Sequence, residues 1–141
     1  ITNSTLSGNA AASGGAVAGI SDASTITVKN ATVDRNTATV AGGGLLVDTF
    51  DVLKLDHVTV MENAAPTGAN LAASSITEIT RSIISQPVGG GTNCGPNPGA
   101  SISAPPAITN AGFSWFNDSS CGAGSNDIVD SGGDPQLGPL A

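Results

Sequence analysis

The segment Asn30-Ala-Thr-Val-Asp-Arg-Asn36 decides the fold, because the chain contains it three times in related form. The other copies are Asn3-Ser-Thr-Leu-Ser-Gly-Asn9 and His57-Val-Thr-Val-Met-Glu-Asn63, so the closing asparagine returns after 27 residues each time (36 − 9 and 63 − 36). A more divergent copy, Arg81-Ser-Ile-Ile-Ser-Gln-Pro87, begins 24 residues after the third (81 − 57). A period of this length is typical of solenoids, in which each unit buries its apolar side by stacking on the next.

Short strands lie on both sides of Asn30. The preceding segment, Thr25-Ile-Thr-Val-Lys29, alternates polar and apolar residues as a strand with one buried face does. After Asn30 the alternation shifts by one residue, which requires a corner, and asparagine tolerates the left-handed backbone of a corner. A third apolar run, Gly42-Gly-Gly-Leu-Leu-Val47, follows Asn36. The sequence therefore predicts an all-β fold, a right-handed parallel β-helix with three strands per coil and about five coils.

Stacked coils place equivalent residues about 4.8 Å apart. Asn9, Asn36 and Asn63 are therefore predicted to form an internal ladder, in which each side-chain amide bonds to the next coil. The composition suits a narrow core, because the chain has only three Phe, one Trp and no Tyr. This ladder is a structural site, and we expect no catalytic residue in it.

The length of 141 residues predicts a single domain. Regular coils are expected over residues 1–88, and irregular C-terminal coils with a disulfide-closed loop over 89–141. Cys94 and Cys121 are separated by the same interval as the ladder asparagines (121 − 94 = 27), which places their Cα atoms within reach of a disulfide if one more coil lies between them. The alternative is two unrelated buried thiols. A disulfide implies an oxidising compartment.

The repeat and the tail together resemble a known family. The tail reads Asn93-Cys94-Gly, then Asn117-Asp-Ser-Ser-Cys121-Gly, and ends in Asp134-Pro-Gln-Leu-Gly-Pro-Leu-Ala141. These motifs are similar to those of bacterial right-handed parallel β-helix proteins of the polymorphic outer membrane protein and choice-of-anchor type. The resemblance implies an exported protein, secreted or at the cell surface or outer membrane, and an adhesin-like role with surface glycans or proteins of a host cell as partners. It also implies that the chain is a piece of a longer protein.

The charge balance limits the partners. Four Lys and Arg against eleven Asp and Glu leave a net charge of −7, which disfavours nucleic acid and anionic membranes. No apolar run approaches the roughly 20 residues of a membrane span. No cofactor or metal is expected. The alternative of a Ca²⁺ site in the tail rests on acids whose spacing matches no known calcium loop: Asp118, Asp127, Asp130 and Asp134.

Candidate catalytic residues all have a structural interpretation. The repeat places Arg35 over Glu62, which predicts an ion pair between coils, and it places Lys29 over Asp56. Asp48 and Asp51 flank a turn, where aspartate is ordinary turn chemistry. Lys54 and Arg81 are expected at outward positions. His57 replaces an asparagine at a corner, where we expect it to be solvated or bonded within a ladder and not to act as a general base.

The sequence therefore favours a non-enzymatic exported module that serves as a structural spacer or an adhesin-like surface. One alternative is a carbohydrate-active β-helix related to polysaccharide lyases or hydrolases. A more distant alternative is an ice-binding solenoid, suggested by the outward column Thr5, Thr32 and Thr59. The aromatic segment Phe113-Ser-Trp-Phe116 is expected to cover the open end of the core.

Overall fold

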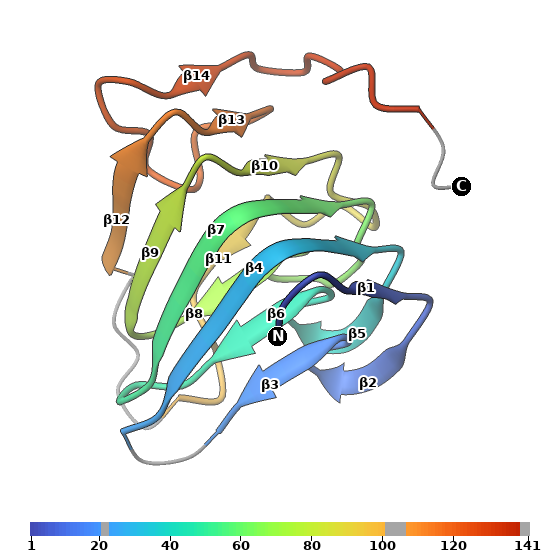
Figure 1. The fold of residues 1–141 in the computed structure, drawn as a ribbon. Coiled ribbons are helices and arrows are strands. Elements are labelled where there is room, and N and C mark those ends of the chain that lie inside the picture. The colour runs from blue at the N-terminus through green and yellow to red at the C-terminus, as the bar shows by residue number, and fades with distance from the viewer. Residues whose placement is uncertain (21–22, 101–106, 139–141) are drawn as a thin grey trace.

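The structure is a computed structural model that describes residues 1–20, 23–100 and 107–138. Within these residues the chain forms strands and turns and no helix. The strands nearest the viewer in Figure 1 run from left to right as the chain rises, and the strands behind them return, so the coil is right-handed. The solenoid has about four turns, close to the expected five, and it confirms the predicted parallel β-helix. Residues 101–106 of the predicted C-terminal coils and residues 139–141 of the tail motif lie outside the described residues.

The strands are short, apart from two of ten residues. In chain order they are β1 (Thr5–Ser7), β2 (Ala10–Ser13), β3 (Val17–Gly19), β4 (Thr25–Asp34), β5 (Thr37–Ala41), β6 (Leu45–Val47), β7 (Val52–Met61), β8 (Leu71–Ala73), β9 (Ile76–Thr80), β10 (Ile83–Ser85), β11 (Cys94–Gly95), β12 (Ala107–Gly112), β13 (Trp115–Phe116) and β14 (Ile128–Val129).

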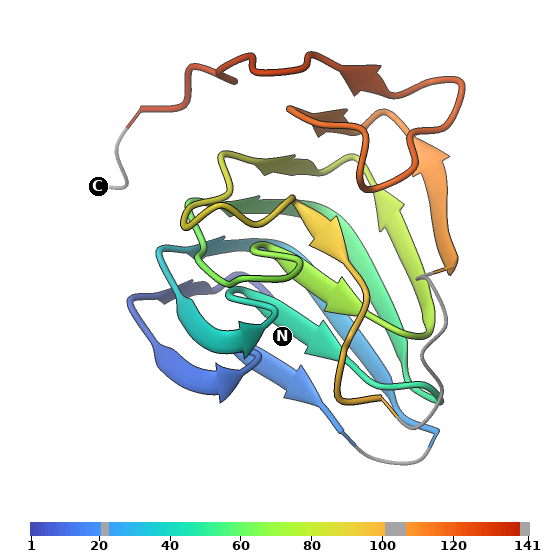
Figure 2. The ribbon, with the colours of Figure 1, turned by 180° about the vertical axis from the view of Figure 1, so that it is seen from behind.

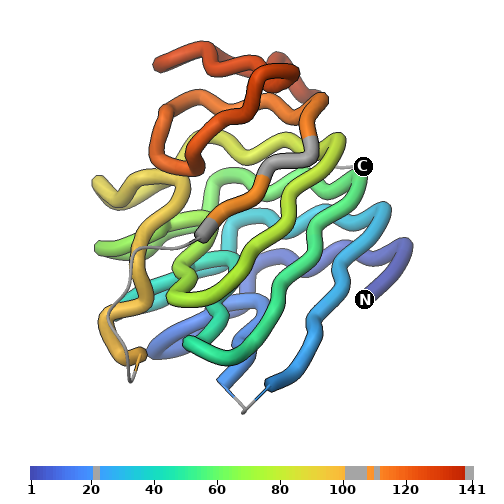
Figure 3. The backbone as a smooth tube through the Cα atoms, turned by 90° about the vertical axis from the view of Figure 1, so that its left-hand side faces the viewer, coloured from blue at the N-terminus to red at the C-terminus, as the bar shows by residue number. Residues whose placement is uncertain are grey.

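Three parallel sheets form the sides of the coil (Figure 2). The largest has the order β1-β4-β7-β10-β13-β14 and also contains β9 and β12; the second has the order β11-β8-β6-β3; the third pairs β2 with β5. The register follows the sequence repeat, because Val33 lies beside Val60 and Val60 beside Ile84. The divergent fourth copy therefore occupies the same place in the coil as the other three, and Figure 3 shows the turns as a stack of rungs.

The predicted corner at Asn30 is confirmed, because its φ is 49°. The strands before and after this corner form one bent strand, β4, and β7 bends in the same way at His57 with φ 56°. Asn3 and Arg81 continue this column of left-handed residues. A second column, one strand further along the coil, was not predicted; it contains Gly8, Arg35, Glu62 and Gln86.

The core is one narrow stack of aliphatic side chains from successive turns. Its largest fully buried aliphatic members are Leu45, Leu53, Leu55, Leu71, Ile79 and Ile84. Close packing of neighbouring coils excludes any side chain at Gly43, where an added Cβ would lie 2.5 Å from the carbonyl oxygens of Ala64 and Ala69. Of the C-terminal aromatics, Phe116 is fully buried in this core, whereas Phe113 is 73% exposed. The aromatic segment thus covers the core through Phe116 and not through Phe113.

The predicted asparagine ladder is present. Asn9 Nδ2 donates to Asn36 Oδ1 at 2.9 Å, and Asn36 Nδ2 donates to Asn63 Oδ1 at 2.9 Å. Each of the two inner amides also bonds to the backbone of the coil below, Asn36 to the carbonyl of Leu6 and Asn63 to that of Val33. Asn36 and Asn63 are fully buried, so these bonds satisfy polar groups that water does not reach.

The ladder extends beyond the three predicted members. Asn63 Nδ2 donates to Asn70 Oδ1 at 2.8 Å, and Asn70 Nδ2 donates to Asn93 Oδ1 at 2.7 Å. Asn93 Nδ2 in turn donates to Asn117 Oδ1 at 2.6 Å. Asn70 enters because the fourth copy has Pro87 where the others have the ladder asparagine, and proline has no side-chain amide. No periodicity in the sequence indicates Asn70.

The disulfide Cys94–Cys121 is also present, with 5.1 Å between the Cα atoms. Both cysteines are buried in the core. Cys94 lies in β11 beside Leu71 of β8, so the irregular C-terminal part continues the stack of the regular coils. The disulfide joins the fourth turn to the segment after β13. It complements the ladder, whose last bond among the described residues is the nearby one to Asn117.

Candidate functional site

A polar groove lies on the outward side of the largest sheet. Its centre is the threonine column, in which Thr5 pairs with Thr32 and Thr32 with Thr59. The two columns of left-handed corners border it, because they lie before and after this short run of strand. From Asn30 to Arg35 the strand rises by about 16 Å. The bent strands therefore form an outward trough. The distance between its two borders is the length of the strand segment between two corners of one coil.

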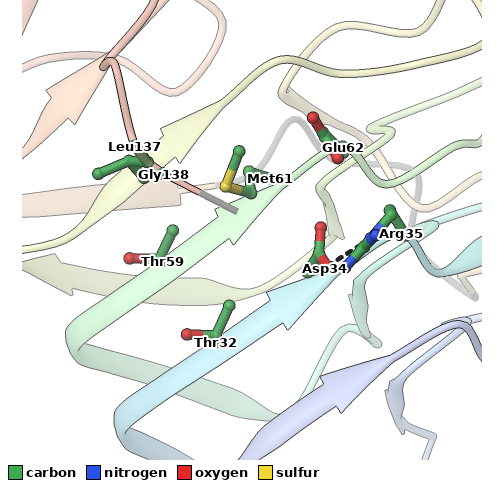
Figure 4. Close-up of a pocket in the computed structure, with 8 residues that line it drawn as sticks. All are labelled: Thr32, Asp34, Arg35, Thr59, Met61, Glu62, Leu137 and Gly138. Atoms are coloured by element: carbon green, nitrogen blue, oxygen red, sulfur yellow. Dashed lines mark hydrogen bonds and ion pairs between the residues drawn. The ribbon is translucent and has the colours of Figure 1, made fainter. Parts of the chain in front are cut away.

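Two adjoining depressions make up the trough. The larger has a volume of about 510 Å³ and the smaller about 260 Å³, and both contain Thr32 and Thr59. The larger is lined by Thr32, Asp34, Arg35, Thr59, Met61, Glu62, Leu137 and Gly138 (Figure 4). The smaller is lined by Asn3, Ser4, Thr5, Asn30, Ala31, Thr32, His57 and Thr59.

The C-terminal segment forms one wall of the larger depression. Gln86 Nε2 donates to Asp134 Oδ1 at 3.1 Å, which attaches this segment to the second column of corners. Leu137 then lies near Met61, and both line the same depression (Figure 4). Sequence reasoning missed this wall, because Leu137 and Met61 are far apart in the chain and no repeat relates them.

The predicted ion pair between Arg35 and Glu62 is wrong. Arg35 Nε instead donates to Asp34 Oδ2 at 2.6 Å. The Asp34 side chain is only 3% exposed, and a buried carboxylate is costly unless a charge or a hydrogen-bond donor reaches it. Ser7 Oγ adds a second hydrogen bond at 3.3 Å. Arg35 therefore pairs with the buried acid next to it, and Glu62 has no ion pair within the described part of the chain.

A second charged cluster lies beside the smaller depression. Asp56 contacts Lys29 at 3.4 Å, His57 at 2.9 Å and Arg81 at 2.6 Å. The contact with Lys29 confirms the predicted placement of these two residues over each other. Burial acts to raise the pKa of Asp56. The hydrogen bond and the charge of Arg81, together with His57 and Lys29, outweigh this effect, so the pKa lies below its ordinary value. Asp56 is therefore a counterion, and His57 is part of this charged surface.

All four basic side chains of the chain are paired with carboxylates. The pairs are Lys29–Asp56, Arg35–Asp34, Lys54–Glu78 and Arg81–Asp56. Proton abstraction from a sugar needs a base that is free to accept a proton near neutral pH. Each of these cations instead contacts an acid and is engaged in an ion pair.

Asp48 and Asp51 lie away from the groove. Asp48 Oδ1 accepts hydrogen bonds from the backbone and hydroxyl of Thr49, as predicted for a turn residue. Asp51 is 1% exposed and accepts a hydrogen bond from the backbone of Ser24 in the coil below at 2.9 Å. The turn assigned from the sequence thus also links two coils through Asp51.

Two acids of the tail, Asp118 and Asp127, accept hydrogen bonds both within local turns and from more distant segments of the chain. Asp127 accepts bonds from the backbone of Ser114 and Gly124. Asp118 accepts from Ser120 and from the backbone of Asn93. Burial acts to raise the pKa of Asp118, but these hydrogen bonds outweigh it and lower the pKa below the ordinary value. Among the described residues, no three His, Cys, Asp or Glu side chains come together as metal ligands.

The threonine column is short. Ile83 pairs with Thr59 and ends it after three coils, and charged residues border it on both sides. A regular, flat array of hydroxyls is therefore confined to three positions, Thr5, Thr32 and Thr59.

The described residues contain no helix long and apolar enough to cross a membrane. Comparison with known protein families, curated proteins and solved structures finds no match for this chain.

Proposed function

We propose that the chain is a non-enzymatic, exported β-helix module, secreted or displayed at a bacterial cell surface, that acts as a rigid spacer with an adhesin-like face. The pairing of every basic side chain with a carboxylate carries this proposal. On the outward face this leaves hydroxyls, amides, paired charges and the carboxylate of Glu62, groups that can bind a partner through hydrogen bonds.

Rigidity supports the role of a spacer. The asparagine ladder links successive turns through buried bonds, and the disulfide joins two segments of the C-terminal part, where the coils are least regular. Less regular units of a solenoid open more easily than the regular ones. A covalent bond across this part therefore holds its segments together.

The disulfide also supports export, since such bonds persist in oxidising compartments. The test is to alkylate thiols in intact cells that make the protein with its natural flanking sequence. We expect Cys94 and Cys121 to resist alkylation before reduction and to react after it. Alkylation of both without reduction would contradict an extracytoplasmic location.

A carbohydrate-active enzyme is the second candidate, because two carboxylates, Asp34 and Glu62, line one depression. Hydrolases use such a pair across the sugar. Against this, Asp34 is bound to Arg35. Incubation with polygalacturonate, alginate and neutral glycans, with and without Ca²⁺, should release no reducing ends and no unsaturated products. Turnover by the natural chain that disappears in Asp34→Asn or Glu62→Gln would replace the proposed function with this one.

A further inference from the structure

The larger depression contains hydrogen-bonding groups that the protein itself does not use. Within the described residues, the hydroxyls of Thr32 and Thr59 make no side-chain hydrogen bond and Glu62 forms no ion pair, while Arg35 uses only its Nε toward Asp34. All of these groups line one depression, and Figure 4 shows the two threonines pointing the same way from β4 and β7. A ligand with several hydroxyl groups would satisfy them.

An apolar wall accompanies these polar groups. Met61 and Leu137 line the same depression, and Leu137 is 41% exposed. The volume of about 510 Å³ falls in the range of about 300–1,000 Å³ that is usual for small-ligand sites. Hydroxyls and carboxylates beside a small apolar wall suit a sugar ring, which has polar edges and C–H faces.

The charge decides between classes of glycan. The chain carries a net charge of −7, and Asp34 neutralises the one guanidinium in the depression. Glu62 adds a further negative charge, so an anionic polymer such as polygalacturonate would be repelled. A neutral glycan has no such penalty, and its hydroxyls donate to a carboxylate.

The backbone excludes a bound peptide strand. Extended peptides bind by adding a strand to a free sheet edge. Thr32 and Thr59 lie in β4 and β7, which have parallel neighbours on both sides. The occupant must therefore bind to the side chains of this face and not to its backbone, as a sugar can.

We propose that this depression binds a neutral oligosaccharide through Thr32, Thr59, Glu62 and the free end of Arg35, with Met61 and Leu137 against the ring. The proposal rests on the proposed adhesin-like function and names its ligand class. Since the site has no aromatic side chain, we expect weak binding per site, with a Kd on the order of 1 mM.

The test is a ¹H–¹⁵N NMR titration of the whole chain with four neutral hexaoses and one anionic one. The neutral probes are the β-1,3-linked and β-1,4-linked glucohexaoses, mannohexaose and chitohexaose, and the anionic probe is hexagalacturonate. We expect at least one neutral hexaose to shift the amides of Thr32, Thr59 and Glu62. Hexagalacturonate should not shift them at the same concentration. Glu62→Ala should weaken binding by about tenfold, since it removes the free carboxylate.

Glu78→Ala is the matched control, because Glu78 is an acid on the same sheet that pairs with Lys54 and does not line the depression. It should leave the affinity unchanged. Tighter binding of hexagalacturonate, shifts confined to other surfaces, or no shift with any neutral hexaose would overturn the ligand class. These results would leave the proposed function standing, because the alkylation and turnover assays test that function without a glycan affinity.

Discussion

Removal of one buried rung tests the asparagine ladder most directly. Asn63→Ala deletes the acceptor for the backbone N–H and side-chain amide of Asn36, both at 2.9 Å, and the donors to Val33 O at 3.0 Å and Asn70 Oδ1 at 2.8 Å. Asn36 Nδ2 keeps its bond to Leu6. The change therefore leaves two buried backbone groups, the N–H of Asn36 and the carbonyl of Val33, each with one bond fewer.

The magnitude follows from these losses. A buried polar group that loses its partner costs about 1–3 kcal/mol, so we expect Asn63→Ala to lower the free energy of unfolding by about 3 kcal/mol. For a chain of this size that corresponds to a fall in Tm of roughly 6–12 °C. Equilibrium unfolding in urea, followed by circular dichroism, measures the free energy and checks that the m-value stays constant.

Asn9→Ala is the control, because Asn9 has the same place in the repeat and lies exposed at the end of the ladder. Its loss should cost less than about 1 kcal/mol, since water replaces the missing bond. Asn63→Asp keeps the shape and an acceptor but removes the donor and buries a charge, so it should destabilise at least as much as alanine. If Asn63→Ala and Asn9→Ala cost the same, the ladder does not stabilise the stack.

Three further predictions concern other parts of the stack. Reduction of Cys94–Cys121 should lower stability by roughly 3.5 kcal/mol, and limited proteolysis should then cut after about residue 89 first; cleavage that starts in the earlier coils would contradict this role. Gly43→Ala should cost about 1–3 kcal/mol through overpacking, measured by thermal unfolding, whereas Gly99→Ala, whose added Cβ would lie 3.5 Å from its nearest neighbour, should be nearly neutral. Because the folded-state pKa of Asp118 is lowered, its contribution should be complete above the ordinary value of about 3.9 and disappear as the pH falls through the lower folded pKa. An unfolding series against pH should therefore lose part of its acid dependence in the Asp118→Asn variant.

The coil itself could be predicted from the sequence because each turn repeats the same local chemistry. Thr25–Lys29 alternates as a strand does, and Asn30 accepts the left-handed corner. Stacking at a fixed spacing then makes an interval in the sequence into a contact in space, which is why Asn36 and Asn63 were identified as neighbours and the two cysteines as a pair.

Only the tertiary structure determined the contacts that break the repeat. Asn70 takes the ladder position that Pro87 leaves empty, and Arg35 turns to the buried Asp34 and not to Glu62. The C-terminal segment brings Leu137 to the outward groove. These contacts depend on which polar groups remain unsatisfied after the coils have stacked and on chain segments that no period relates. A repeat therefore determines the scaffold of this protein, while the burial and the long-range packing of individual side chains determine the shape and the free groups of its binding face.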